Sequence, residues 1–148
     1  MLAKARQRGW AASLAIIGAV AALVACQSMT PMMEEQQITL SGANEVPAVA
    51  TSATGTGTVT IRADRSVSAR ITVTGMVATA SHIHEGAAGA NGPVIVPFVK
   101  TGDNTFVAPD GAKLTEAQYA SYKAGNLYVN VHSAKNPGGE VRAQLKAN

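Results

Sequence analysis

From residue 37 onward, the sequence alternates short runs rich in β-branched residues with clusters of Gly, Pro, Asn and Asp. Such runs, closed by turn-forming residues, are typical of antiparallel sheets. The runs that we predict as strands are Gln37–Ser41, Gly55–Arg62, Val67–Thr74, Ala80–His84, Val94–Val99, Leu127–Ser133 and Glu140–Leu145. We therefore predict an all-β fold, an antiparallel Greek-key-like β-sandwich or barrel.

Local sequence also predicts two hairpins and one helix. The segments 63–66 (Ala-Asp-Arg-Ser) and 136–139 (Asn-Pro-Gly-Gly) have the composition of tight turns, so each is expected to join two neighbouring strands. A short helix is expected over Thr115–Ala124, because its first residue and Gln118 have the spacing of a capping box and Gly125 is placed to end it. This helix would connect strands rather than form a layer.

The first 25 residues have the features of an export signal. Three basic residues precede an apolar stretch, Trp10–Val24, whose only polar side chain is that of Ser13. This stretch has the length of a signal-peptide core and is short for a membrane span, so we predict its cleavage. The segment Leu23-Val24-Ala25-Cys26 resembles the bacterial lipobox, in which the cysteine receives the lipid. We therefore predict a signal peptide over residues 1–25 and lipidation of Cys26.

Residues 26–36 are polar, contain Pro31 and have no regular hydrophobic period, which predicts a flexible tether. Acyl chains on Cys26 would hold the chain on a membrane. The absence of Asp after this cysteine favours the outer membrane of a Gram-negative bacterium, with the protein facing the periplasm. Residues 37–148 are expected to form one domain. Because Cys26 is the only cysteine, no intrachain disulfide can hold this domain together.

The charge balance gives no reason to expect a nucleic acid partner. The chain has 12 Lys and Arg against 9 Asp and Glu, but three of the basic residues lie in the predicted signal peptide. The mature chain would therefore be balanced, and a balanced surface lacks the positive potential that attracts phosphates. We expect a membrane contact through the lipid and consider an envelope protein as a further partner.

The histidines are the main candidates for chemistry. In the run 80–84, His82 and His84 share one face of the strand while Ile83 points to the other. In the run 127–133, every second residue is apolar, so His132 points away from the core together with residues 128 and 130. Two imidazoles at positions i and i+2 lie about 7 Å apart at the backbone, which allows both to converge on one ion.

His132 would supply a third ligand if its strand lies beside the run 80–84, which gives a three-nitrogen site suited to copper or zinc. The alternative is that His82 and His84 form a solvated pair, hydrogen-bonded to loop carbonyls. Three further residues could support a metal site. Glu85 follows the second imidazole and could accept a ligand N–H or bind the ion, Asn130 shares a face with His132, and Arg142 could steer small anions.

For two of these supporting residues there are plainer interpretations. Glu85 could be an exposed loop acid, and Arg142 could be a solvated strand residue that pairs with Glu140. The sequence has no Gly-x-Ser-x-Gly and no phosphate loop, so we assign no catalytic residue.

Three ordered motifs carry a resemblance to a known family. They are Gly42-Ala43-Asn44-Glu45-Val46-Pro47, then Ser81-His82-Ile83-His84-Glu85-Gly86 with Asn91-Gly92-Pro93-Val94, and Tyr128-Val129-Asn130-Val131-His132 with Asn136-Pro137-Gly138-Gly139-Glu140-Val141-Arg142. The segment from Ile38 to Leu145 resembles the CHRD (chordin-type) domain. This resemblance implies an extracytoplasmic β-sandwich, and it implies a fold more directly than a function.

A looser resemblance links the His-x-His segment, and the later Val-His with its Gly-rich turn and Arg-bearing strand, to copper-zinc superoxide dismutase. In that family these segments hold copper. With only three histidines and one cysteine, this chain lacks the bridging imidazole, the zinc-loop ligands and the cysteine pair. The resemblance therefore implies at most a mononuclear copper site.

The function that we predict is that of a lipid-anchored cell-envelope CHRD module. It would bind a transition metal through His82, His84 and His132, with copper ahead of zinc, or serve as an interaction module. One alternative is a mononuclear copper redox enzyme, with superoxide as the substrate to test. Another is a structural or adhesive envelope protein without a metal.

Overall fold

The computed structural model describes residues 35–147, which lie in one compact unit. The predicted signal peptide, Cys26 and most of the predicted tether fall outside these residues. Within the described part of the chain, no helix is both long and apolar enough to cross a bilayer. The strands are β1 Gln36–Ser41, β2 Thr54–Ile61, β3 Val67–Thr74, β4 Ala78–Glu85, β5 Val94–Pro97, β6 Val99–Gly102, β7 Thr105–Val107, β8 Leu127–Ser133 and β9 Val141–Gln144, and the helices are a 3-10 turn, Gly42–Asn44, and α1, Glu116–Lys123.

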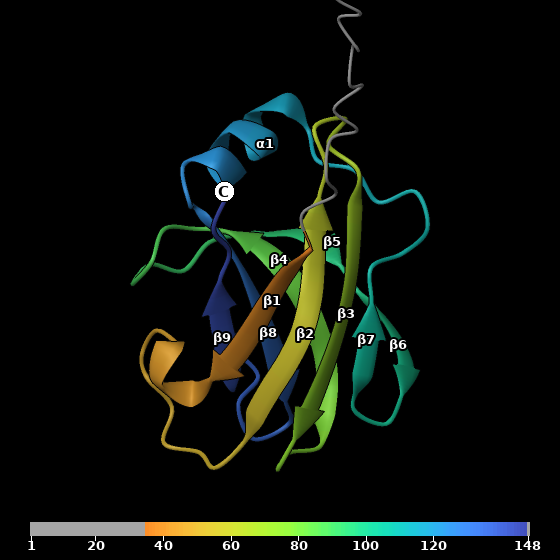
Figure 1. Ribbon diagram of the computed structural model, residues 1–148. Coiled ribbons are helices and arrows are strands. Elements are labelled where there is room, and N and C mark those ends of the chain that lie inside the picture. Colours follow the sequence, from red (N-terminus) through yellow and green to blue (C-terminus); the bar gives the residue numbers. More distant parts are fainter. Residues whose placement is uncertain (1–34, 148) are drawn as a thin grey trace, which may run out of the picture. The chain divides into compact units, whose positions relative to one another are not determined.

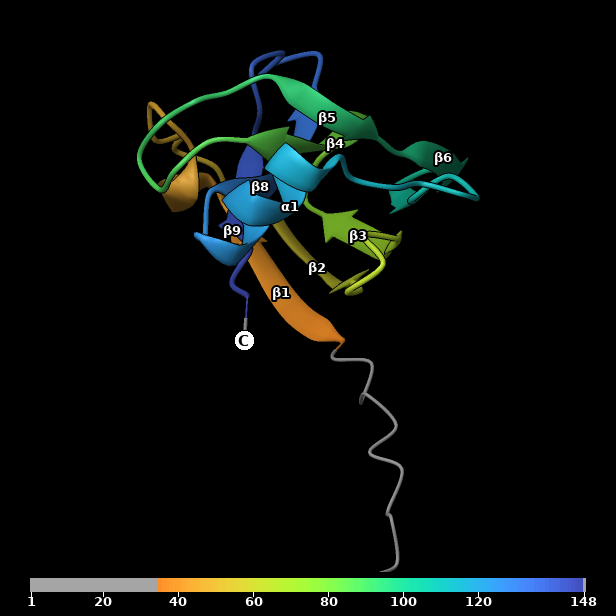
Figure 2. The ribbon, with the colours of Figure 1, turned by 90° about the horizontal axis from the view of Figure 1, so that it is seen from above.

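These strands form one antiparallel sheet in the order β5-β4-β8-β9-β1-β2-β3-β7-β6. The sheet folds over on itself, so β4, β8 and β9 lie across the core from β2 and β3 (Figure 1, Figure 2). On one side, the chain runs from β5 through Phe98 to β6, and the N–H of Phe98 donates to the carbonyl of Ser81. On the other side, β1 and β9 share a single pair, Ser41 opposite Arg142. The predicted all-β, barrel-like architecture is confirmed.

The inner face of the folded sheet is apolar. Ile83 of β4, Val129 and Val131 of β8 and Val141 of β9 are fully buried there and belong to the core cluster. Burying a side chain of this kind stabilises the fold by about 1.5–3 kcal/mol. Because successive strand residues point to opposite faces, the residues between these positions lie on the outer face of the sheet.

Both predicted hairpins and the predicted helix are present. β2 pairs with β3, and β8 pairs with β9, each across its expected turn. Thr115 caps α1, with its hydroxyl accepting from the N–H of Gln118 and its own N–H donating to the Gln118 side chain. Gly125 follows the helix with a φ of 76°, a left-handed conformation that glycine adopts readily. α1 lies across one end of the sheet (Figure 1).

The sequence prediction was wrong between residues 94 and 107. The single predicted strand Val94–Val99 is two strands, because β5 ends at Pro97 and Phe98 separates it from β6. Proline has no N–H to continue a ladder, so it favours such a break. β7 was not predicted, since it is only three residues long and has too few positions to show an alternating pattern.

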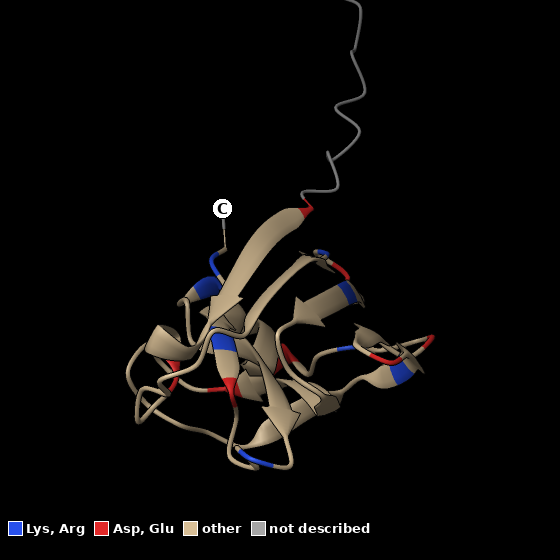
Figure 3. Cartoon of the chain, turned by 90° about the horizontal axis from the view of Figure 1, so that it is seen from below, with Lys and Arg blue, Asp and Glu red and all other residues tan. Residues whose placement is uncertain are grey.

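Charged side chains of both signs are interspersed over the domain. In the view of Figure 3, Lys and Arg segments lie among Asp and Glu segments instead of gathering on one side. This distribution has the mixed character that the sequence composition suggested.

Candidate metal centre

The outer face of β4, β8 and β9 carries polar side chains that the strand register brings together. Across neighbouring strands the partners are His82 with Asn130, His84 with Tyr128, and Asn130 with Arg142. His132 joins this group from the next outer-face position of β8, because alternate strand residues share a face. Three strands that are separate in sequence therefore build one cluster.

All three predicted metal ligands lie in this cluster. One potential ligand atom from each of His82, His84 and His132 lies within 4.8 Å of the others. The ring centroids of His82 and His132 are 4.8 Å apart, and that of His84 is 5.5 Å from His82 and 6.0 Å from His132. Small side-chain rotations can bring such nitrogens to the metal–nitrogen distance of about 2.0–2.1 Å. The three imidazoles can therefore hold one metal ion.

Backbone carbonyls orient two of the rings. Nδ1 of His84 donates to the carbonyl of Gly92 at 2.9 Å, and Nδ1 of His132 donates to the carbonyl of Pro137 at 2.9 Å. A carbonyl only accepts, so each neutral ring carries its proton on Nδ1 and has a free lone pair on Nε2. Nε2 of His132 then accepts from Nδ1 of His82 at 3.0 Å.

The second ring nitrogen of His84 supports the fit to a metal. Nε2 of His84 is buried and has no hydrogen-bond partner. An unsatisfied buried acceptor costs about 1–3 kcal/mol, and a bound metal ion would satisfy it. Carbonyl hydrogen bonds on the opposite nitrogen are also the arrangement that orients metal-binding imidazoles in proteins.

Burial favours the neutral form of His82 and His84. Burial, together with repulsion from the rings of His132 and His84, lowers the pKa of His82 to about 4. Burial also lowers the pKa of His84, although hydrogen bonds that its charged form would make to Gly92 and Asn130 act in the opposite direction. Only a neutral imidazole offers its lone pair to a metal. Both rings are therefore in their binding form at neutral pH.

The interpretation of His82 and His84 as a solvated pair is wrong for His84. His84 and His132 are each 8% exposed, and Asn130 is 2% exposed, although His84 does bond to a loop carbonyl as that interpretation expected. Segments 86–93 and 134–139 supply the carbonyls and lie against this face. Gly92 allows the segment 86–93 to fold back over β4, because a Cβ at this position would lie 1.6 Å from the carbonyl oxygen of Glu85. His82 is the partly exposed member of the three.

Tyr128 supports the cluster, and the sequence analysis did not assign it a role. The His84 ring stacks on the Tyr128 ring, with centroids 4.8 Å apart and an interplanar angle of 8°. The Tyr128 hydroxyl accepts from the N–H of Gly92 at 3.2 Å, and Gly92 in turn accepts from His84. Tyr128 therefore holds both the plane of this imidazole and the carbonyl that orients it.

A family model described as the CHRD domain matches residues 36–145. This chain belongs to the CHRD domain family. The match runs from the first residue of β1 to Leu145, just after β9, and it includes the three motifs noted in the sequence. Neither the curated proteins nor the solved structures gave a match.

In this CHRD domain, Arg142 is a structural residue of the interior. It is 1% exposed, and its guanidinium carbon lies 3.4 Å from the centroid of the Tyr128 ring. The guanidinium donates to the carbonyls of Ala87 and Ala90 and to the side chains of Asn91 and Gln144. The prediction of a solvated residue is therefore wrong, and these acceptors occupy the guanidinium that was expected to steer anions.

Two carboxylates of the CHRD domain also have roles that differ from the predicted ones. Glu85 accepts a hydrogen bond from Ser121 of α1 at 2.5 Å, so it anchors the helix instead of orienting an imidazole. Glu85 shares a face of β4 with Ile83, and His84 lies on the opposite face. Glu140 accepts from Thr51 and Ser133, and so it holds two segments together instead of pairing with Arg142.

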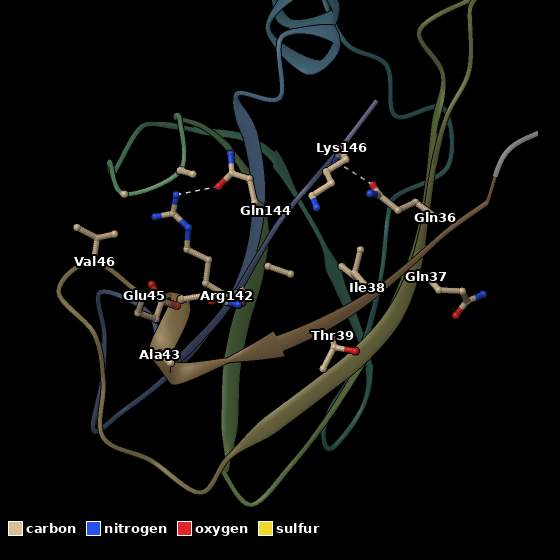
Figure 4. A pocket seen from close by; sticks show the side chains of 14 residues that line it. Gln36, Gln37, Ile38, Thr39, Ala43, Glu45, Val46, Arg142, Gln144 and Lys146 are labelled. Atoms are coloured by element: carbon tan, nitrogen blue, oxygen red, sulfur yellow. Dashed lines mark hydrogen bonds between the residues drawn. The ribbon is translucent and has the colours of Figure 1, made fainter. Parts of the chain in front are cut away.

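Glu45, which was named above only as part of the first sequence motif, is a buried acid. It is 6% exposed, and its Oε1 has no hydrogen-bond partner. Burial raises the pKa of Glu45 to about 7, against the opposing effect of Arg142. Both residues line a cavity of about 620 Å³ beside β1 and β9 (Figure 4). This setting depends on the fold, which brings residues 45 and 142 to the same cavity, and no local sequence pattern indicates it.

Proposed function

We propose that this CHRD domain binds a copper ion through His82, His84 and His132. The proposal is carried by the convergence of three imidazoles, two of which are oriented by the carbonyls of Gly92 and Pro137. Orienting hydrogen bonds of this kind are usual at metal sites and contribute to affinity. Nothing else in the described chain gathers ligand groups of this type.

The donor set favours copper over other metals. Imidazole nitrogen binds both copper and zinc well, and the affinity of a given site among divalent first-row metals peaks at Cu(II). Zinc is therefore the second candidate. When bound, copper would supply a one-electron redox couple, which zinc would not.

The role that we propose is to hold the metal in the cell envelope, for storage, transfer or recognition by an envelope partner. A second candidate is a copper redox enzyme acting on superoxide. One observation favours it: His82 is partly exposed, so a small molecule can approach that edge of the site. The rate of superoxide decay distinguishes the two roles. It is measured with the copper-loaded protein and with the same total concentration of copper in a chelating buffer without protein.

The proposed location rests on the N-terminal sequence. Its basic start, apolar stretch and Leu-Val-Ala-Cys ending support lipidation of Cys26 and attachment to the outer membrane. Replacing this residue, Cys26→Ala, should move the protein from the membrane fraction to the soluble fraction. His132→Ala should leave it in the membrane fraction. Retention of the Cys26→Ala protein on the membrane would refute the anchor.

Calorimetric titration tests the metal site directly. Residues 27–148, which contain the whole described sheet, are titrated with Cu(II), Cu(I) and Zn(II). We expect tight one-to-one binding of Cu(II), and a loss of at least about a hundredfold in His82→Ala and in His132→Ala. Thr72→Ala, at an exposed position of β3, is the control and should bind as the unmodified chain does. Equal binding by all four proteins would refute the site and leave a structural or adhesive role.

A further inference from the structure

The side chain of Asn130 has an acceptor atom that a three-nitrogen site does not explain. Asn130 is 2% exposed and stands opposite His82 in the register of β4 and β8. Its Oδ1 is buried and has no hydrogen-bond partner, whereas buried polar atoms in folded proteins are nearly always paired. An unpaired oxygen on the same sheet face as the three histidines therefore needs an explanation.

The surroundings determine which end of the amide faces the histidines. Nδ2 of Asn130 donates to the carbonyl of Gly138, at 3.5 Å. This leaves Oδ1 as the end of the amide available to the rings. The natural donor to this oxygen would be a ring N–H of His84, which lies on the same outer face of the sheet, opposite Tyr128.

Neutral His84 has no such proton to give. Its proton sits on Nδ1, which donates to Gly92, so only a lone pair is present on Nε2. Nε2 of His84 and Oδ1 of Asn130 are thus two buried acceptors, each without a partner. Neighbouring lone pairs repel one another, and a cation that binds both removes the repulsion.

On the basis of the copper site proposed above, we infer that Oδ1 of Asn130 is a fourth ligand. The site is then a closed set of three nitrogens and one oxygen, and it selects divalent copper or zinc over Cu(I). Amide oxygen is a harder ligand than imidazole nitrogen, and hard oxygen ligands suit divalent cations, whereas Cu(I) prefers soft ligands. Four protein ligands are typical of sites that hold a metal, while catalytic sites keep a position open. Asn130 is therefore the residue that determines which oxidation state the domain keeps.

The test compares three variants in the chain 27–148. Asn130→Val removes the oxygen and keeps a side chain of similar size, Asn130→Asp keeps an oxygen in the same place, and Ser81→Ala is the control. Ser81 donates to the backbone carbonyl of Asn130 at 2.9 Å, so its loss disturbs the same strand pair from the core side. Each protein is titrated with Cu(II), Zn(II) and Cu(I), and the Cu(II) form is examined by electron paramagnetic resonance.

For Asn130→Val we expect Cu(II) and Zn(II) affinity to fall at least about tenfold, Cu(I) affinity to change less than about threefold, and the Cu(II) spectrum to shift. Asn130→Asp should retain divalent binding with an altered Cu(II) spectrum, and Ser81→Ala should match the unmodified protein. If the unmodified protein binds Cu(II) while Asn130→Val shows the same affinity and spectrum, the fourth ligand is refuted and the histidine site stands. If the unmodified protein binds no metal, the proposed function itself fails. Should Asn130→Val not fold, Asn130→Asp decides, since an unchanged Cu(II) spectrum in that variant overturns the inference.

Discussion

Nδ1 of His82 lies 3.0 Å from Nε2 of His132, across the pairing of β4 and β8. The direction of this hydrogen bond is determined by a third group. Nδ1 of His132 donates to the carbonyl of Pro137, which leaves Nε2 as an acceptor, so His82 must be the donor. In the metal-free domain a proton on Nδ1 of His82 therefore occupies the direction in which a metal ion would bind.

Metal binding should consequently change the tautomer of one histidine only. We expect the proton of His82 to move from Nδ1 to Nε2 when Zn(II) is added, while His84 and His132 keep their protons on Nδ1 toward Gly92 and Pro137. Long-range ¹H–¹⁵N correlation spectra of the imidazoles, recorded with and without Zn(II), report this directly. A spectrum in which His82 stays protonated on Nδ1 with zinc bound would show that this nitrogen is not the ligand.

Tyr128→Phe tests the support of the His84 imidazole. The substitution keeps the ring that stacks on His84 and removes the hydroxyl that accepts from Gly92. Loss of one hydrogen bond should lower the free energy of unfolding by about 1 kcal/mol, and the less well held Gly92 carbonyl should weaken Cu(II) binding by about tenfold. Urea unfolding and calorimetric titration measure the two effects. Unchanged affinity would mean that Gly92 is held in place by other contacts.

Arg142→Lys should be severely destabilising although it keeps the charge. The guanidinium of Arg142 donates to four acceptors and stacks on the Tyr128 ring. An ammonium group cannot reproduce this planar arrangement, so buried carbonyls lose partners. We expect the free energy of unfolding to fall by about 2–4 kcal/mol. Arg70→Lys, at an exposed position of β3, is the control and should change it by less than about 0.5 kcal/mol.

Glu45→Gln should change how stability depends on pH. The fold raises the pKa of Glu45 from 4.5 to about 7, so the folded state binds this proton more tightly than the unfolded state does. The resulting stability is fully present below pH 4.5 and is lost as the pH rises through about 7. Glutamine cannot ionise, and the variant should therefore gain stability relative to the unmodified domain as the pH rises across this range. Urea unfolding at several pH values measures the difference, and parallel curves for the two proteins would contradict it.

The face on which each histidine lies could be predicted because strands have a period of two. Once Ile83 and Val131 are assigned to the core, His82 and His132 must point the other way, and the structure confirms this. No local sequence pattern predicted that β4 and β8 are neighbours in the sheet. The strand and turn pattern predicted the all-β fold, and the resemblance to the CHRD domain, which the match over residues 36–145 confirms, implied the same fold.

The burial of that outer face could not be read from alternation. A period of two shows which side chains avoid the core, but it does not show that a loop will cover them. Arg142 reads as a solvated residue until the segment 86–93 is seen to fold back and accept its hydrogen bonds. Glu45 is similar, because its pKa depends on its burial and on the charge of Arg142, a residue far from it in the sequence.

β4 and β8 are neighbours in the sheet, although His82 and His132 are 50 residues apart along the chain. A metal ion bound by both would tie these distant segments together in a chain whose single cysteine precludes an internal disulfide. Restricting the unfolded chain in this way favours the folded state, as any cross-link over a long loop does. The metal would thus act as a removable cross-link, and the resistance of the domain to proteases would rise and fall with the supply of that metal.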